Sequence, residues 1–240
     1  MPNAHAEKAS EAAGAAATTR DVPPASTPHV PPRPKPLLRG WSHLVGALVT
    51  ASVGPSLAGS AGAGSARWLT AVYVVAITAM LGASALYHVP HWSPRARRAL
   101  KRVDHSASFV GVAGTYTPIA GHALGGAGGI ALLITVWTGA LGGIVLANWR
   151  LDAPKWLRSL PYVVLGWIAV LAVPGLWSAV GAGSVALLVA GGALYTVGAA
   201  VYAARRPDPW PRVFGSHEVF HALVLAAVAC HWAVIARAVG

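Results

Sequence analysis

Cysteine and acidic residues are the two classes of side chain that this sequence has little of. Cys230 is its single cysteine, so neither a disulfide framework nor a cluster of cysteine metal ligands can form within one chain. Seven Asp and Glu stand against 18 Lys and Arg, and charged residues make up only 10% of the 240 positions. A soluble domain of this size normally carries about 25% charged residues. The composition therefore indicates a protein whose solvent is lipid.

The formal net charge of +11 would suggest a nucleic-acid partner in a soluble protein. Here the Lys and Arg residues lie between long apolar stretches, where they are typical of membrane anchors and topology signals. We therefore expect membrane lipids as partners and no nucleic acid. Gly139 and Gly143 lie four positions apart in one apolar run. They favour close helix packing within the monomer, with a dimer face as the alternative, so the oligomeric state stays open.

Seven apolar runs have about the 20 residues that a helix needs to cross a hydrocarbon core about 30 Å thick. They lie near residues 41–63, 68–89, 104–122, 127–148, 160–179, 184–204 and 216–236. Strands of a membrane barrel have about ten residues of alternating polarity, unlike these runs. The sequence predicts an all-α integral membrane protein with seven transmembrane helices, a multi-pass protein of the cell membrane. Residues 1–36 are expected to form a disordered Pro/Ala-rich cytoplasmic tail before a membrane domain at 37–240.

The loops between these runs alternate in charge. Of the 18 Lys and Arg, only Arg67 and Arg237 fall outside the N-terminal tail and the second, fourth and sixth loops with their flanks. Short cytoplasmic loops accumulate Lys and Arg. The sequence therefore predicts a cytoplasmic N-terminus and an extracytoplasmic C-terminus.

Ionisable side chains inside membrane helices are costly and often functional, and the predicted topology places several at one depth in the cytoplasmic leaflet. His88 ends the second run with Ser84 one turn deeper, Asp104 opens the third run, and His217 and His221 open the seventh. Residues four apart share a helix face, so the last two can bind one metal ion. Because catalytic zinc sites use about three protein ligands, His88 is the natural third ligand for Zn²⁺.

The segment from His217 to His221 reads HEVFH and also matches the HExxH signature of zinc metalloproteases, in which the glutamate is the general base. A membrane metalloprotease is therefore one alternative. The competing interpretation makes Glu218 a solvated carboxylate at the mouth of the helix, with Asp104 as the base. His43 lies just inside the first run at the same depth, and the sequence assigns it no role.

A histidine without partners in the pattern is more often a buried, hydrogen-bonded core residue than a ligand. His231 is expected to be of this kind, because it lies about 21 Å along the helix from His217. His91, His105 and His122 are expected at loops or interfaces.

Five ungapped motifs carry a family resemblance. They are RGWSH at 39–43, SALYH at 84–88, DHS at 104–106, GTYTP at 114–118 and FGSHEVFH at 214–221. In this order they resemble the hemolysin III family, the bacterial branch of the progestin and adiponectin receptor superfamily, which is related to alkaline ceramidases.

The resemblance implies a seven-helix fold with one zinc ion held by His88, His217 and His221 near the cytoplasmic surface. It also implies that Asp104 holds or activates a water molecule, with Ser84 close by. Relatives can carry Gln at the position of Glu218, which argues against the protease mechanism. The related ceramidases imply hydrolysis of a lipid amide, and the bacterial branch is named for reported hemolytic pore formation.

Three functions follow from these observations. The first is a zinc-dependent hydrolase of a lipid amide or ester at the cytoplasmic leaflet, in which zinc activates water and Asp104 orients that water or takes its proton. Ser84 would hydrogen-bond the ligand or substrate. The second is a non-enzymatic membrane sensor or regulator with structural zinc. The third is a pore-forming hemolysin, which needs a continuous polar stripe along a helix, whereas the runs from 127 to 204 hold almost no ionisable residues.

Overall fold

The structure is a computed structural model that describes residues 35–149 and 153–239. Every regular element in these residues is a helix, which confirms the all-α prediction. The elements are α2 (Trp41–Ser60), α3 (Ser65–His88), α4 (Pro94–Pro118), the π-helix η1 (Ile119–Leu124), α5 (Gly126–Trp149), α6 (Lys155–Trp167), the 3₁₀-helix η2 (Ile168–Ala172), α7 (Val173–Ala204) and α8 (Ser216–Val239). The predicted N-terminal tail lies outside the described residues as far as position 34.

Helix α4 begins at Pro94, well before the predicted apolar run at residue 104. The side chain of Ser93 caps this helix by accepting a hydrogen bond from the Ala96 N–H at 3.3 Å. Proline suits the first helical position, where its missing N–H would have no partner. The basic residues after Pro94 therefore form the first turns of α4 and do not lie in a loop.

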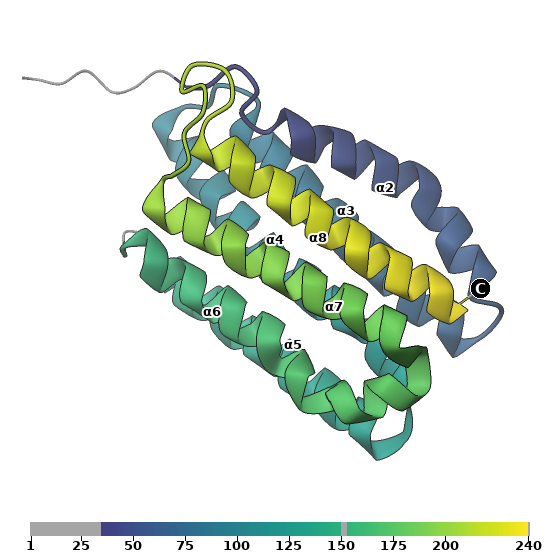
Figure 1. Ribbon diagram of the computed structural model, residues 1–240. Coiled ribbons are helices and arrows are strands. Elements are labelled where there is room, and N and C mark those ends of the chain that lie inside the picture. The colour runs from purple at the N-terminus through teal and green to yellow at the C-terminus, as the bar shows by residue number, and fades with distance from the viewer. Residues whose placement is uncertain (1–34, 150–152, 240) are drawn as a thin grey trace, which may run out of the picture. The chain divides into compact units, whose positions relative to one another are not determined.

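The fifth predicted run, 160–179, is not one continuous helix. Helix α6 ends at Trp167, η2 follows, and α7 begins at Val173. Pro174 has no N–H to donate back along the chain, which disfavours an unbroken α-helix here. Helix α7 is itself interrupted at Gly181, where φ is 74° and ψ is 164°, and the chain turns back on itself in this region (Figure 1).

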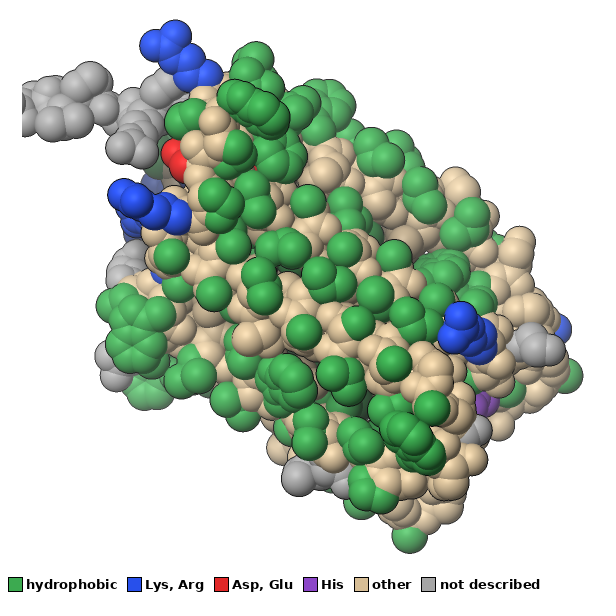
Figure 2. Space-filling model, viewed as in Figure 1, with side chains coloured by type: hydrophobic (Ala, Val, Ile, Leu, Met, Phe, Trp, Pro, Cys, Tyr) green, Lys and Arg blue, Asp and Glu red, His purple; other side chains and the backbone are tan. Residues whose placement is uncertain are grey.

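Four helical segments of the described residues are long and apolar enough to cross a membrane: α3, α5, residues Val180–Ala204 of α7, and α8. Large hydrophobic side chains also cover the outside, and Trp68 and Trp149 are 73% and 78% exposed. Figure 2 shows hydrophobic side chains spread over one whole face, with most of its Lys and Arg at one end. Soluble monomers rarely expose apolar surface on this scale, so this exterior suits lipid.

The helices pack as a bundle in which α8 lies between α2 and α7, and α3 lies between α2 and α4 (Figure 1). Helix α5 packs on α4, and α6 packs on α7. Gly143 of α5 lies against the ring of Phe109, and Gly139 lies against Leu165. These two glycines therefore serve close packing within one chain.

The segment before α2 ties together the ends of α3 and α8. The Lys35 Nζ donates to the Val89 carbonyl at 2.8 Å, just after the end of α3. The Leu37 N–H donates to the Arg212 carbonyl at 3.0 Å, in the loop before α8. These bonds hold the last turn of α3 next to the first turn of α8.

Candidate metal centre

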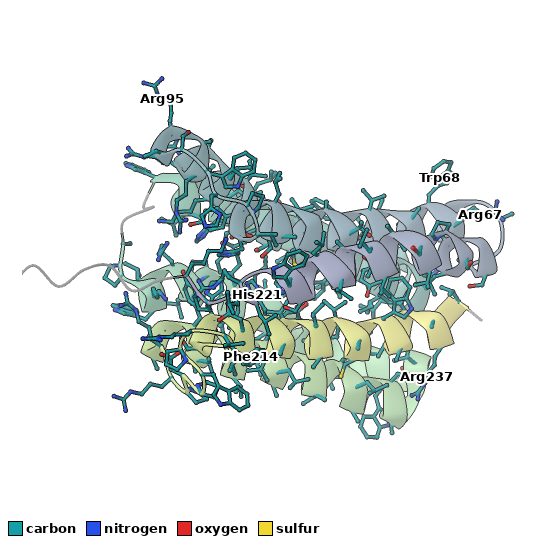
Figure 3. All side chains as sticks on the ribbon, turned by 90° about the horizontal axis from the view of Figure 1, so that it is seen from above. Arg67, Trp68, Arg95, Phe214, His221 and Arg237 are labelled. Atoms are coloured by element: carbon teal, nitrogen blue, oxygen red, sulfur yellow. The ribbon has the colours of Figure 1, made fainter. Side chains whose placement is uncertain are left out.

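Three histidines from α3 and α8 meet where these helix ends lie together. His88 is the last residue of α3, and His217 is the second residue of α8. Their Nε2 atoms are 3.1 Å apart. His221, one turn further along α8, completes a group in which one ligand atom from each ring lies within 4.8 Å of the others. Figure 3 shows His221 in the interior between the helices.

The geometry of this group fits a metal ion. Two nitrogens bound at about 2.0–2.1 Å to one tetrahedral ion stand roughly 3.3–3.4 Å apart, and the 3.1 Å between His88 and His217 is close to this separation. His221 is 1% exposed, and its buried Nδ1 has no hydrogen-bond partner within residues 35–149 and 153–239. A buried polar nitrogen normally has a partner. Imidazoles suit zinc, copper, iron and nickel, so the three residues could hold one such ion.

Ser84, Asp104 and His43 lie beside the three histidines. Ser84 lies one turn before His88, and its Oγ is 2.8 Å from Nδ1 of His43. The side chain of Asp104, from α4, interacts with Ser84. Asp104 does not belong to the group of ligand atoms that lie within 4.8 Å of one another. The carboxylate of Asp104 is therefore connected to the three-histidine group through Ser84 and His43.

The contact between His43 and His221 was not predicted from the sequence. The ring of His43 stacks on that of His221, with centroids 3.7 Å apart and planes 10° from parallel. Its shared depth with the other histidines was visible in the sequence. The stack itself depends on how α2 packs against α8, which no spacing within one helix indicates.

Glu218 is buried, so the expectation of a solvated carboxylate is wrong. It is 1% exposed. Its Oε1 accepts a hydrogen bond from Arg39 Nε at 2.5 Å, and its Oε2 accepts one from the Gly215 N–H at 2.8 Å. The carboxylate satisfies an orphan N–H at the start of α8 and a neighbouring guanidinium. Both oxygens are thus engaged in holding the chain together, which disfavours a general-base role.

Comparison with known proteins decides the family. The model of the family described as Haemolysin-III related matches residues 33–232. The chain belongs to the haemolysin III family. It is 34% identical over 149 residues to the Hemolysin-3 homolog of Bacillus subtilis (strain 168), across 62% of this chain and 66% of that protein. It is 32% identical over 168 residues to Hemolysin-3 of Bacillus cereus, across 70% of this chain and 74% of that protein.

Family membership confirms the predicted resemblance, and the chain is a membrane protein of the haemolysin III family.

Four of the five sequence motifs of this haemolysin III protein contribute residues that lie at or beside the three histidines. The fifth, at residues 114–118, has a packing role: the Tyr116 hydroxyl donates to the Gly166 carbonyl at 2.6 Å and accepts from the Ala169 N–H at 2.9 Å. Tyr116 thereby joins α4 to the region where α6 passes into η2.

The other histidines of the described residues lie outside this three-histidine group. His105 contacts the Tyr162 hydroxyl through its Nδ1 at 3.3 Å, and the Nε2 of His122 lies 3.3 Å from the Thr70 hydroxyl. His231 lies beside Tyr195, and its buried Nδ1 has no hydrogen-bond partner in the part of the chain that the structure describes. His231 is therefore separate from the three histidines, as its distance along the helix predicted. The expectation of a hydrogen-bonded core residue is not met at its Nδ1.

A cavity of about 420 Å³ contains the three histidines in its wall. Arg97, Asp104, Val112 and Ile119 recur along the lining face of α4 and its continuation into η1. From Arg97 to Val112 this face descends about 22 Å at 1.5 Å per residue. Its side chains change on the way from charged to apolar. The cavity therefore has the polarity profile of an amphiphile, with a charged end and an apolar end.

Proposed function

We propose that this haemolysin III protein is a zinc-dependent membrane hydrolase that cleaves a lipid amide or ester at the cytoplasmic leaflet of the cell membrane. One observation carries the proposal: His88, His217 and His221 gather beside Ser84 and Asp104 at the charged end of a cavity whose other end is apolar. An acyl chain in the apolar part would bring its carbonyl to the level of the histidines. A soluble substrate would leave most of the apolar lining unused.

We further propose seven membrane crossings with a cytoplasmic N-terminus. The crossings are α2, α3, α4 with η1, α5, the stretch from α6 to Val180, the remainder of α7, and α8. In support, Arg67 and Arg237 lie at the end of the bundle opposite to Arg95 (Figure 3). The end that carries Arg95 also carries the starts of α4 and α6, which are rich in Lys and Arg. This asymmetry is what the positive-inside rule describes.

In this mechanism His88, His217 and His221 would hold a zinc ion through neutral imidazole nitrogens. Zinc bound there would supply a Lewis acid for the carbonyl and would lower the pKa of water towards about 7. Asp104 accepts the proton of the attacking water as general base. Ser84 lies between His43 and Asp104, so its hydroxyl holds the carboxylate in place.

The protease and pore alternatives have less support. Both oxygens of Glu218 already accept hydrogen bonds, so this carboxylate is poorly placed to take a proton from water. Beyond the three histidines the cavity lining is mostly apolar, with separate polar groups such as Tyr195 and His231, whereas a hydrophilic pore needs polar side chains along its whole length. A sensor with structural zinc would use the same histidines and differs from the hydrolase only in turnover.

Replacement of Asp104 by Asn tests the hydrolase. Asp104→Asn keeps the size of the side chain but removes the proton acceptor, so it should retain most of its zinc and its melting temperature while losing release of fatty acid from a panel of ceramide-like amides and esters. Glu218→Gln is the comparison, and it should retain turnover per folded molecule. The protease predicts the reverse pattern. If wild-type protein with full zinc releases nothing from any lipid amide or ester, the sensor replaces the enzyme.

A further inference from the structure

Arg158, one turn into α6, has a buried guanidinium with hydrogen-bond donors to spare. Its Nη2 donates to the Tyr202 hydroxyl at 3.3 Å. Its Nε and Nη1 are buried and have no hydrogen-bond partner among the described residues, although the side chain lines the cavity. Buried charges are almost always paired, because an unpaired one forfeits its hydration. This guanidinium therefore has two donors available for a bound acceptor.

Lys155 adds a second positive charge at the same place. Its Nζ lies 4.2 Å from the centroid of the Tyr202 ring and 3.4 Å from the Tyr202 carbonyl oxygen. Neither Lys155 nor Arg158 forms an ion pair with a carboxylate of the described residues. Arg158 and Arg205 are close enough to Lys155 for their like charges to act on it. These cations repel one another, and an anion between them would relieve the repulsion.

Tyr202 connects this pair of cations to the three-histidine group. Its ring centroid is 5.7 Å from that of His217. Arg97 and Lys101 of α4 line the same cavity. Positive charge is therefore concentrated at the end of the cavity that holds the histidines, while apolar side chains line the part beyond them.

We propose that Arg158, Lys155 and Tyr202 form an oxyanion-binding subsite for the phosphate group of an anionic membrane lipid. Guanidinium and ammonium groups together are the usual protein partners of phosphate, because both form charge-assisted hydrogen bonds with its oxygens. The acyl chain of the lipid enters the apolar part of the cavity, which a free phosphate would leave unfilled. The inference rests on the proposed function only where it treats this lipid as the substrate of the hydrolase. The binding of the lipid itself does not require hydrolysis.

Binding to the full-length protein in detergent micelles tests the subsite. Three probes are titrated by calorimetry: a mono-acyl glycerol phosphate, the uncharged mono-acyl glycerol with the same chain, and inorganic phosphate. The acyl phosphate should bind most tightly. Loss of charge-assisted hydrogen bonds in Arg158→Gln should weaken its binding about 10- to 100-fold. Arg158→Lys should weaken it less, because the charge remains but the planar fork of donors is lost.

Arg95→Gln is the matched control. It removes the same charge at the same end of the bundle, but Arg95 is exposed and points away from the helices (Figure 3). Its affinity for the acyl phosphate should equal that of the wild type. Equal binding by Arg158→Gln and the wild type, at unchanged melting temperatures, would overturn the proposal. Equal affinity for inorganic phosphate and the acyl phosphate would overturn the assignment to a lipid.

A chelator separates this proposal from the hydrolase. Metal-free wild-type protein should still bind the acyl phosphate, and Arg158→Gln should still weaken that binding. Binding with this pattern but without turnover of any lipid would sink the hydrolase and leave the subsite standing. Turnover of neutral lipid amides that is unchanged in Arg158→Gln, with no preference for the acyl phosphate over the uncharged lipid, would sink the subsite and leave the hydrolase.

Discussion

His43 of α2 and His221 of α8 stack face to face, with ring centroids 3.7 Å apart. The same His43 is hydrogen-bonded to Ser84 of α3 at 2.8 Å. One side chain thus links a residue of the metal-binding group to the serine that neighbours Asp104. His43 does not belong to the three histidines that could hold a metal ion, so its expected effect is on the orientation of His221 and Ser84.

Substitutions at His43 can separate the stack from the hydrogen bond. Groups that orient metal ligands typically contribute 10- to 100-fold to metal affinity, so His43→Ala should weaken zinc binding by about that factor. His43→Phe keeps a flat ring against His221 but cannot bond to Ser84. It should restore much of the zinc affinity while lowering kcat more than it raises KM. Competition with a chromophoric chelator gives the affinity, and an unchanged value in His43→Ala would remove the positioning role.

Zinc content tests the three ligands directly. Purified protein should carry about one zinc per chain, and His88→Ala, His217→Ala and His221→Ala should each lower that content sharply, because zinc geometry depends on every ligand. His231→Ala is the control, since it removes an imidazole of the same cavity that lies outside the group. Elemental analysis after dialysis provides the measurement. Full zinc in all three variants would return these histidines to a packing role.

Apolar length and charge alternation were enough to predict the all-helical class and four of the helices with little error. They were not enough for the region from Trp167 to Gly181, because the chain there remains apolar while its backbone passes through 3₁₀ geometry and a left-handed glycine. Glycine and proline in an apolar run signal such breaks only weakly, since membrane helices tolerate both.

The grouping of the three histidines could be predicted from their positions in the sequence. His217 and His221 lie on one helix at a spacing that a metal requires, and His88 shares their depth once the topology is assumed. The burial of Glu218 could not be predicted from the sequence, because its partner Arg39 lies 179 positions away. Contacts between distant segments depend on packing angles that no local pattern encodes.

The ion pair of Arg39 and Glu218 should contribute measurably to stability. Arg39→Ala leaves the carboxylate of Glu218 buried without its cation, and removal of one partner of a buried pair is strongly destabilising. Because the Arg39 side chain is 24% exposed, we expect a loss of roughly 2–3 kcal/mol. Arg95→Ala, at an exposed position of the same end, should stay within about 0.5 kcal/mol. Reversible denaturation in detergent gives both values, and equal losses would mean that the pair adds nothing.

Membrane topology decides on which side of the membrane the cavity has its charged end. The helix starts that are rich in Lys and Arg lie at the same end as the three histidines, so the proposed topology, which follows the positive-inside rule, puts this candidate metal centre at the cytoplasmic leaflet. A reporter fused after Gly240 should therefore read as extracytoplasmic, as should one inserted between α2 and α3 at Gly62. A reporter inserted between Arg206 and Arg212 should read as cytoplasmic.

The reporters at Gly62 and after Gly240 check each other, because they lie on the same side only if the chain from α3 to α8 crosses the membrane an even number of times. Opposite sides for these two would mean that one of the proposed crossings does not span. Reversal of all three would place the histidines, and any lipid they act on, in the outer leaflet.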